Sequence, residues 1–311
     1  MTEDQSGPGL PPAARARMAE IRGSGTWGSA LSAEEFAAVR SVGFEPVGQV
    51  LGAAVYNIGY TGGYACPGAW AGYGGYVTPF RSVTSVSRGG GGDMGSFGAL
   101  VQTMYAARHK AIDRMSAECA ALGGHGVVSA SIEIGRFPAG GLEFKVIGTA
   151  VRAPGGIPLS APFTSDLSGQ DFAKLIMAGW VPAGFVLGIS IGARHDDWLT
   201  VSQTAWGTGN SEVTGYTDLV NEARHDARGQ LEQDVRRLGA DGVVVSSMDM
   251  RVSDRECPMQ ENRKDHIVEV TIIGTATARF ARPHHPPRGS SLAIMSLDPQ
   301  RRQAARVRLG R

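Results

Sequence analysis

The residues ARHKAIDRMSAECAALGGHGVV, from Ala107 to Val128, decide the fold because the chain contains the same pattern a second time. From Ala223 to Val244 it repeats as ARHDARGQLEQDVRRLGADGVV, with unchanged spacing between the opening Ala-Arg-His and the closing Gly-Val-Val. In both copies a helical stretch ends at a glycine turn that leads into a Val-rich segment. The sequence therefore predicts an internal duplication.

The match between the two copies extends in both directions. Upstream, LSAEEF at 31–36 is repeated as LSGQDF at 167–172, and downstream VIGTA at 146–150 is repeated as IIGTA at 272–276. A repeat of about 120 residues has the size of a small domain. These matches divide the chain into a disordered N-terminal segment over 1–30, domain 1 over 31–153, a linker over 154–166, domain 2 over 167–281 and a Pro/Arg-rich C-terminal tail over 282–311.

Each copy carries the signals of a short helix followed by a strand, a long helix and two strands. Ser32 and Glu35 have the spacing of a capping box, and Gly43 supplies the left-handed residue that ends the short helix. Apolar residues at helical spacing predict the first long helix over 96–122. The expected strands are 45–57, 126–135 and 141–152 in the first copy, and 242–252 and 267–280 in the second. The expected fold class is α+β, with two β-α-β-β domains in tandem.

Composition and charge exclude several classes of protein. The net charge is +1, but seven Arg and the single acidic residue Asp298 give the last 30 residues a charge of +6 and leave −5 on the rest. Such a tail either stays disordered or contacts an acidic partner. The three cysteines lack metal-ribbon spacing, and no apolar run reaches the about 18–20 residues that span a bilayer. We therefore expect a cytoplasmic protein with neither a membrane segment nor a specific nucleic-acid partner.

Each long helix carries an Arg within its apolar stripe. Arg108 and Arg224 occupy equivalent positions of the two copies, and each is followed by a histidine, His109 or His225. An Arg on a buried face needs a partner. We interpret both arginines as structural ion pairs or subunit contacts, with a ligand clamp as the alternative. The histidines are expected on a helix face or an interface rather than as ligands.

The long helix, the Leu-Gly turn before Val-Val and the Gly-Thr-Ala near the end of each copy resemble the YbjQ family, which carries a heavy-metal-binding description. The resemblance covers 31–153 and 167–280. It implies a dodecin-like fold for each domain and a homo-oligomeric ring, with five chains in known members. This chain departs from its relatives because it is a tandem and because Gly89–Gly92 replaces an ordered loop before the first long helix.

The candidate metal ligands lie around the last hairpin of the second copy. Soft metals prefer thiolate and thioether ligands. The weak candidates are Met248, Met250, Cys257 and Met259. Met248 and Met250 share one face of a strand, because side chains alternate along it. The alternative is that these methionines cover a core, and the first copy has no equivalents, so we expect neither a metal nor any other cofactor.

The C-terminal tail carries apolar residues in a segment that otherwise has the composition of a linker. They are Leu292, Ile294 and Leu297, within the sequence SLAIMSL at 291–297. This run is similar to the cargo-loading peptides of encapsulin nanocompartments, which implies docking on a shell protein. The alternative is that the tail docks on the domains of its own chain.

The sequence leaves three functions open. We find no H-E-x-x-H or paired-carboxylate motif, so we expect no enzyme. The leading hypothesis is a self-assembling scaffold or small-ligand-binding protein. The alternatives are a soft-metal-binding protein and a cargo or adaptor protein that docks a partner such as an encapsulin shell through its tail.

Overall fold

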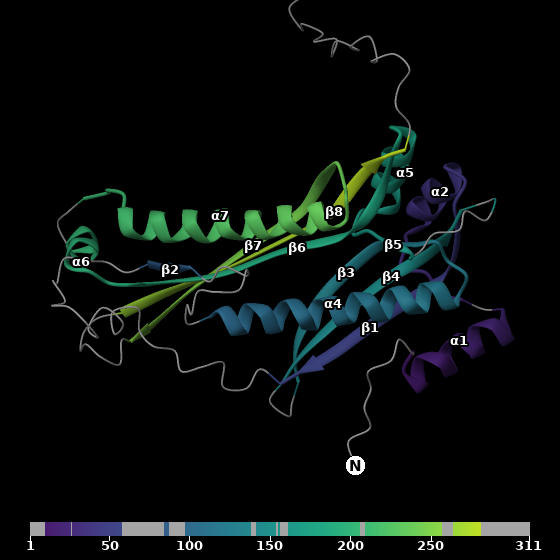
Figure 1. Cartoon of the computed structure of the whole chain (residues 1–311), viewed down its shortest axis with the longest axis horizontal. Helices are drawn as coiled ribbons and strands as arrows, with labels where there is room; N and C mark the ends of the chain where they lie inside the picture. The colour runs from purple at the N-terminus through teal and green to yellow at the C-terminus, as the bar shows by residue number, and fades with distance from the viewer. Residues whose placement is uncertain are drawn as a thin grey trace, which may run out of the picture.

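Each half of the chain folds as a long helix packed on an antiparallel sheet, preceded by a short helix (Figure 1). The α+β class and the order strand, helix, strand, strand agree with the sequence prediction. The computed structural model describes residues 10–25, 27–57, 84–86, 97–137, 141–153, 155, 161–205, 209–256 and 264–280. The tyrosine- and glycine-rich insertion at 58–80, the glycine run at 89–92 and the C-terminal tail lie outside these residues.

Domain 1 is built on a sheet with the strand order β1-β4-β3-β5, here called sheet A. Its pairs are antiparallel except β3 with β5, a short parallel pair contributed by the segment that leads into domain 2. The long helix α4 packs on one face of this sheet, mainly over β1 and β4. The elements are α2 (Ala33–Ser41), β1 (Glu45–Tyr56), α4 (Gly98–Ala121), β3 (Gly126–Phe137), β4 (Gly141–Arg152) and β5 (Phe163–Thr164).

Domain 2 repeats this plan with longer strands. Its sheet, here called sheet B, has the order β2-β6-β8-β7, so β7 forms its outer edge. The short helix α6, which the sequence did not predict, follows the first long strand. Domain 1 contributes the short edge strand β2 (Thr84–Val86) to this sheet, where it pairs with β6. The elements of domain 2 are α5 (Gly169–Met177), β6 (Trp180–His195), α6 (Trp198–Thr204), α7 (Thr214–Arg237), β7 (Gly242–Glu256) and β8 (Lys264–Arg279).

The short helices begin and end where the sequence signals predict. Ser32 and Glu35 form the capping box of α2, in which each side chain bonds the backbone N–H of the other residue. After α2, Gly43 has a φ of 86°, and Gly179 has a φ of 82° after α5, a conformation that favours glycine. These local signals orient each chain segment before its first strand.

The helix α4 belongs to a core shared by both domains. Its apolar side chains pack on sheet A, and the same buried cluster includes Phe185, Leu187, Ile189 and Ile191 of β6. These β6 residues lie on the face of sheet B that points away from α7, whose own cluster contains Val186 and Val270. Figure 1 shows the resulting order of α7, sheet B and α4. The two domains are therefore joined by a continuous apolar interior rather than by a loose linker.

The N-terminal segment differs from the prediction of disorder, because α1 (Pro12–Ser24) is helical and packs on domain 1. Met18 is buried, and the Arg17 guanidinium pairs with the Glu118 carboxylate of α4. The composition, rich in Gly and Pro, did not indicate this helix, because tertiary contacts rather than local propensity stabilise it. Among the described helices, none combines the length and apolar character needed to cross a bilayer.

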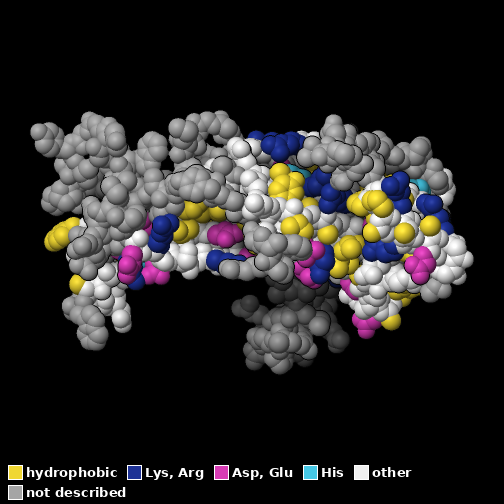
Figure 2. Space-filling view, turned by 90° about the horizontal axis from the view of Figure 1, so that it is seen from below, with side chains coloured by type: hydrophobic (Ala, Val, Ile, Leu, Met, Phe, Trp, Pro, Cys, Tyr) yellow, Lys and Arg dark blue, Asp and Glu magenta, His cyan; other side chains and the backbone are white. Residues whose placement is uncertain are grey.

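The surface that carries α1 and sheet A shows small apolar patches between charged groups (Figure 2). Lys and Arg side chains gather toward the end of the molecule where α1 and α2 lie. The exposed apolar residues include Val55 on β1 and five residues on β7. Edge strands with exposed apolar side chains are candidates for contacts with other chains.

Candidate functional site

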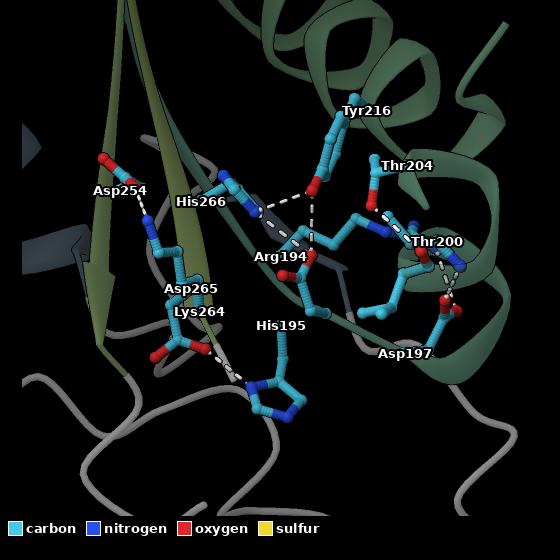
Figure 3. A network of polar contacts seen from close by, with 12 residues as sticks. Arg194, His195, Asp197, Thr200, Thr204, Tyr216, Asp254, Lys264, Asp265 and His266 are labelled. Atoms are coloured by element: carbon cyan, nitrogen blue, oxygen red, sulfur yellow. Dashed lines mark hydrogen bonds and ion pairs between the residues drawn. The ribbon is translucent and has the colours of Figure 1, made fainter. Parts of the chain in front are cut away.

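A cluster of ionisable side chains lies at the end of sheet B where β6 runs into α6 (Figure 3). It is called the polar cluster here. Strands β6 and β8 supply most of its members, and the first turn of α7 supplies a tyrosine. The polar cluster consists of Arg194, His195, Asp196, Asp197, Tyr216, Asp265 and His266.

Each histidine of the polar cluster is paired with a carboxylate. His195 Nδ1 lies 2.7 Å from Asp265 Oδ1, and Asp265 is fully buried. His266 Nε2 lies 3.1 Å from Asp196 Oδ1. The Tyr216 hydroxyl lies between this second pair, 3.1 Å from the carboxylate oxygen and 2.9 Å from the imidazole nitrogen. The polar groups of β6, β8 and α7 therefore bind one another rather than solvent.

Arg194 and Asp197 position the two helices that flank the polar cluster. Asp197 caps α6 by accepting the N–H of Thr200 at 2.6 Å, and its other oxygen lies 3.3 Å from the Arg194 guanidinium. Gly215, at the start of α7, lies against that guanidinium, since a Cβ there would be only 2.7 Å from Arg194 Nε. The Arg side chain thus fills the space between α6 and α7.

The chemistry of the polar cluster favours a structural role. Burial raises the pKa of Tyr216, and the Asp196 carboxylate raises it further, so the hydroxyl stays protonated and donates a hydrogen bond. Within the part of the chain that the structure describes, no three His, Cys, Asp or Glu side chains converge as a metal site. The cluster therefore fixes the junction of β6, α6 and α7.

Arg108 lies at the boundary between the domains. Its side chain is 2% exposed and lies over the Phe144 ring, with 5.8 Å between the guanidinium carbon and the ring centroid. Burial lowers the pKa of Arg108 to about 10, which still leaves it charged at neutral pH, and the Glu269 carboxylate of β8 favours that charge. Tyr105, one turn away, accepts the N–H of Ile189 at 2.8 Å. The α4 flank is thus a domain contact.

The equivalent Arg224 has a different environment. Arg224 and His225 are exposed on α7, whereas His109 is half-buried with its Nε2 3.9 Å from Asp234 Oδ2. Arg224 therefore does not share the buried environment of Arg108, and the interpretation of both arginines as ion pairs or subunit contacts stays a prediction. The reason is that domain 2 covers the flank of α4, while within the described residues nothing covers the corresponding flank of α7.

The candidate metal ligands are only partly described. Met248 and Met250 lie on β7 and are 46% and 39% exposed, and Cys257 and Met259 lie outside the described residues. The register pairs the two methionines with Ile272 and Val270, so they lie on the same face of sheet B as α7. They belong to a series of exposed or half-buried apolar side chains, called the apolar row here: Val243, Val245, Met248, Met250 and Val252.

Sequence reasoning missed the polar cluster and the shared core. The run RHDDW at 194–198 and the residues KDH at 264–266 were the available signals, since charged residues interrupt two strand ends that are otherwise apolar. Only the pairing of β6 with β8 brings these two runs together. The tail residues Leu292, Ile294 and Leu297 lie outside the described residues, so their role stays a prediction.

Comparison with known proteins gives two matches. The profile of the family described as "Putative heavy-metal-binding" matches the chain twice, over residues 81–154 and 184–279. A protein of Mycobacterium tuberculosis (strain ATCC 25618 / H37Rv), named encapsulin nanocompartment protein Rv1762c, is 31% identical over 278 residues. That match covers 87% of this chain and 92% of the relative. No solved structure matches the chain.

The double match confirms the tandem duplication predicted from 107–128 and 223–244. Each matched region contains one long helix, α4 or α7, and the strands that follow it. The two regions together span more than half of the chain. The chain therefore belongs to the YbjQ family, described as "Putative heavy-metal-binding", and contains two copies of its domain.

Proposed function

We propose that this chain is a cargo protein that docks on an encapsulin shell through its C-terminal tail. The observation that carries the proposal is the relative named as an encapsulin nanocompartment protein, which matches nearly the whole chain. The run SLAIMSL at 291–297, similar to cargo-loading peptides, supports it independently. A tail that carries spaced apolar residues in a segment with the composition of a linker suits a partner groove.

Co-expression with an encapsulin shell tests this function. The full chain is expected to co-purify with assembled shells, and deletion of 290–311 is expected to abolish co-purification. The triple variant Leu292→Ala, Ile294→Ala, Leu297→Ala should have the same effect, because it removes the apolar contacts alone. The double variant Gln300→Ala, Gln303→Ala is the matched control in the same tail, and it should co-purify with the shell like the full chain. Co-purification of the deleted chain at the level of the full chain would refute the proposal.

Self-assembly is the second function that a specific observation favours. The apolar row lies on β7, which is an edge strand of sheet B. Natural sheets usually cover an edge strand with exposed apolar side chains. We propose that copies of the chain form a cytoplasmic homo-oligomer, with the ring of the family resemblance as its form. In this role the chain acts as a scaffold or binds small ligands without catalysing a reaction.

The heavy-metal description of the family has a separate test. The chain would be purified without chelators or affinity metals, and its metal content measured by elemental analysis beside the Cys257→Ser variant. We expect no stoichiometric metal in either, because the first copy of the domain has no equivalents of the candidate ligands. Stoichiometric soft metal that disappears in the variant would establish the metal-binding function instead.

A further inference from the structure

The two domains are joined by a segment that adds an edge to sheet A. In the segment 163–167, Ser165 N–H donates to Val127 O, and Ser165 O accepts from Ala130 N–H, both at 2.9 Å. The same segment is fixed to domain 2, because Asp166 N–H donates to Thr275 Oγ1 at 3.1 Å. It therefore belongs to domain 2 while it covers the edge of β3.

Residues 27–31 repeat this segment at the start of domain 1. Ala30 N–H donates to Thr149 Oγ1 at 3.0 Å, as Asp166 does to Thr275. Leu31 N–H donates to Ser29 Oγ at 3.0 Å, and Leu167 makes the same turn with Ser165. The outer side of 27–31 pairs with no strand among the described residues. Residues 27–31 are thus the counterpart of 163–167, but within the described residues they have no strand edge to pair with.

Strand β7 presents the complementary edge. It is the counterpart of β3, and within the described ranges its only strand partner is β8. Val128 of β3 is fully buried beneath the connecting segment, whereas the equivalent Val244 is 40% exposed. A long edge strand with apolar side chains is a template for pairing.

Part of the apolar row, around Met248, occupies positions that domain 2 covers on domain 1, whereas Ile134, the counterpart of Met250, is 45% exposed. Met248 is equivalent to Ile132, because each lies opposite the same position of the last strand, Ile272 or Val146. Ile132 packs against the core shared by the domains, while Met248 is exposed. The difference between buried Arg108 and exposed Arg224 has the same pattern. The surface that domain 2 covers on domain 1 therefore has a counterpart on domain 2, and within the described residues nothing covers that counterpart.

We propose that the occupant of the free β7 edge is a second copy of this chain. Residues 27–31 and the β1 face of the second copy cover β7, the apolar row and the α7 flank of the first. The contact repeats between chains the junction that joins the domains within one chain, and so joins copies head to tail. This inference rests on the self-assembly proposed above and assigns its surfaces.

The β1 face has the apolar positions that this contact needs. Leu51, Ala53 and Val55 occupy the positions of Leu187, Ile189 and Ile191, which β6 buries against domain 1. Leu51 and Ala53 are half-buried, and Val55 is exposed. Glu118 of α4 lies beside this surface, and its carboxylate is already paired with Arg17 of α1. Residues 27–31 and the strands of the second copy therefore make the proposed contact, and α4 does not.

Disulfide trapping between two single variants tests the proposed register. Gly28 and Val243 correspond to Thr164 and Val127, which are paired in the junction within the chain. A Cβ at Gly28 meets no atom closer than Gln49 Oε1 at 3.8 Å, so a cysteine fits there. Oxidation of mixed Gly28→Cys and Val243→Cys chains should give a cross-linked dimer. Each variant alone controls for the native cysteines, and no excess dimer in the mixture would overturn the proposal.

Native mass spectrometry of the full chain supplies the second test. We expect species that contain two or more whole copies of the chain. Val244→Asp places a charge on the proposed interface and should weaken association about tenfold or more. Leu199→Asp, at an exposed position of α6 outside the contact, is the matched control and should assemble like the native chain. Monomers alone, or oligomers that Val244→Asp leaves unchanged, would overturn the proposal. No shell is present, so the result is independent of the tail.

Discussion

Gly188→Ala is expected to destabilise domain 2, because the strand β6 lies against the backbone of the helix α7 at this glycine. A Cβ at Gly188 would lie 2.1 Å from Ala227 O and 3.2 Å from Leu231 Cβ. A Cβ atom does not approach another heavy atom closer than 3.0 Å, so the helix must move away by about 1 Å. Such overpacking costs about 1–3 kcal/mol in unfolding free energy. For a domain of this size, that cost corresponds to a fall in Tm of about 4–12 °C.

Thermal unfolding followed by circular dichroism measures this change. Gly229→Ala is the control on the same helix, because a Cβ there meets nothing within 4 Å. Removing a glycine from a helix stabilises it by about 0.5–1 kcal/mol, so the control should melt about 2–4 °C higher. Gly52→Ala, where the Cβ would lie 1.8 Å from Ala111 O, should destabilise domain 1 similarly. A Gly188→Ala chain that melts with or above the native chain would refute the packing argument.

Three further predictions follow from buried groups. Tyr105→Phe should lower the unfolding free energy by about 1–3 kcal/mol in urea denaturation, because the Ile189 N–H loses its acceptor, and an unchanged midpoint would contradict this. Burial raises the pKa of Asp234, so its contribution to stability is present below the ordinary carboxyl pKa of about 3.9 and is lost as pH rises through the raised value. Asp234→Asn should therefore gain stability relative to the native chain as pH rises from 4 to 7, and a constant difference would refute the assignment. Burial raises the pKa of the Cys119 thiol to about 12, so iodoacetamide at pH 8 should label it only when urea opens the fold, and rapid native labelling would show that the thiol is accessible.

The elements of the repeated unit were predictable because their signals are local, whereas α1 and α6, outside the repeat, were not. The expected strand over 141–152 agrees with β4, and the expected helix over 96–122 differs from α4 by only one or two residues at each end. Periodic apolar residues, the Ser32 cap and the Gly43 turn fix these elements without reference to the rest of the chain. The prediction of two similar units was correct for the same reason.

The environment of each unit was not predictable from its own residues. Arg108 and Arg224 occur in the same local sequence, yet one is buried and the other exposed. The difference arises because domain 2 covers α4, a contact between residues far apart in the sequence. The pairing of 163–167 with β3 and of His195 with Asp265 likewise depends on tertiary structure. The local sequence therefore determined the elements but not the surfaces that meet.

Transfer of the tail to an unrelated protein tests the central claim about function most directly. Residues 282–311 would be fused to a monomeric fluorescent protein and co-expressed with an encapsulin shell, beside the same fusion with Leu292→Ala, Ile294→Ala and Leu297→Ala. We expect the native tail to bring fluorescence into the shell fraction on a sizing column, and we expect the triple variant not to do so. Equal fluorescence in the shell fraction for both fusions, or none for either, would contradict the claim.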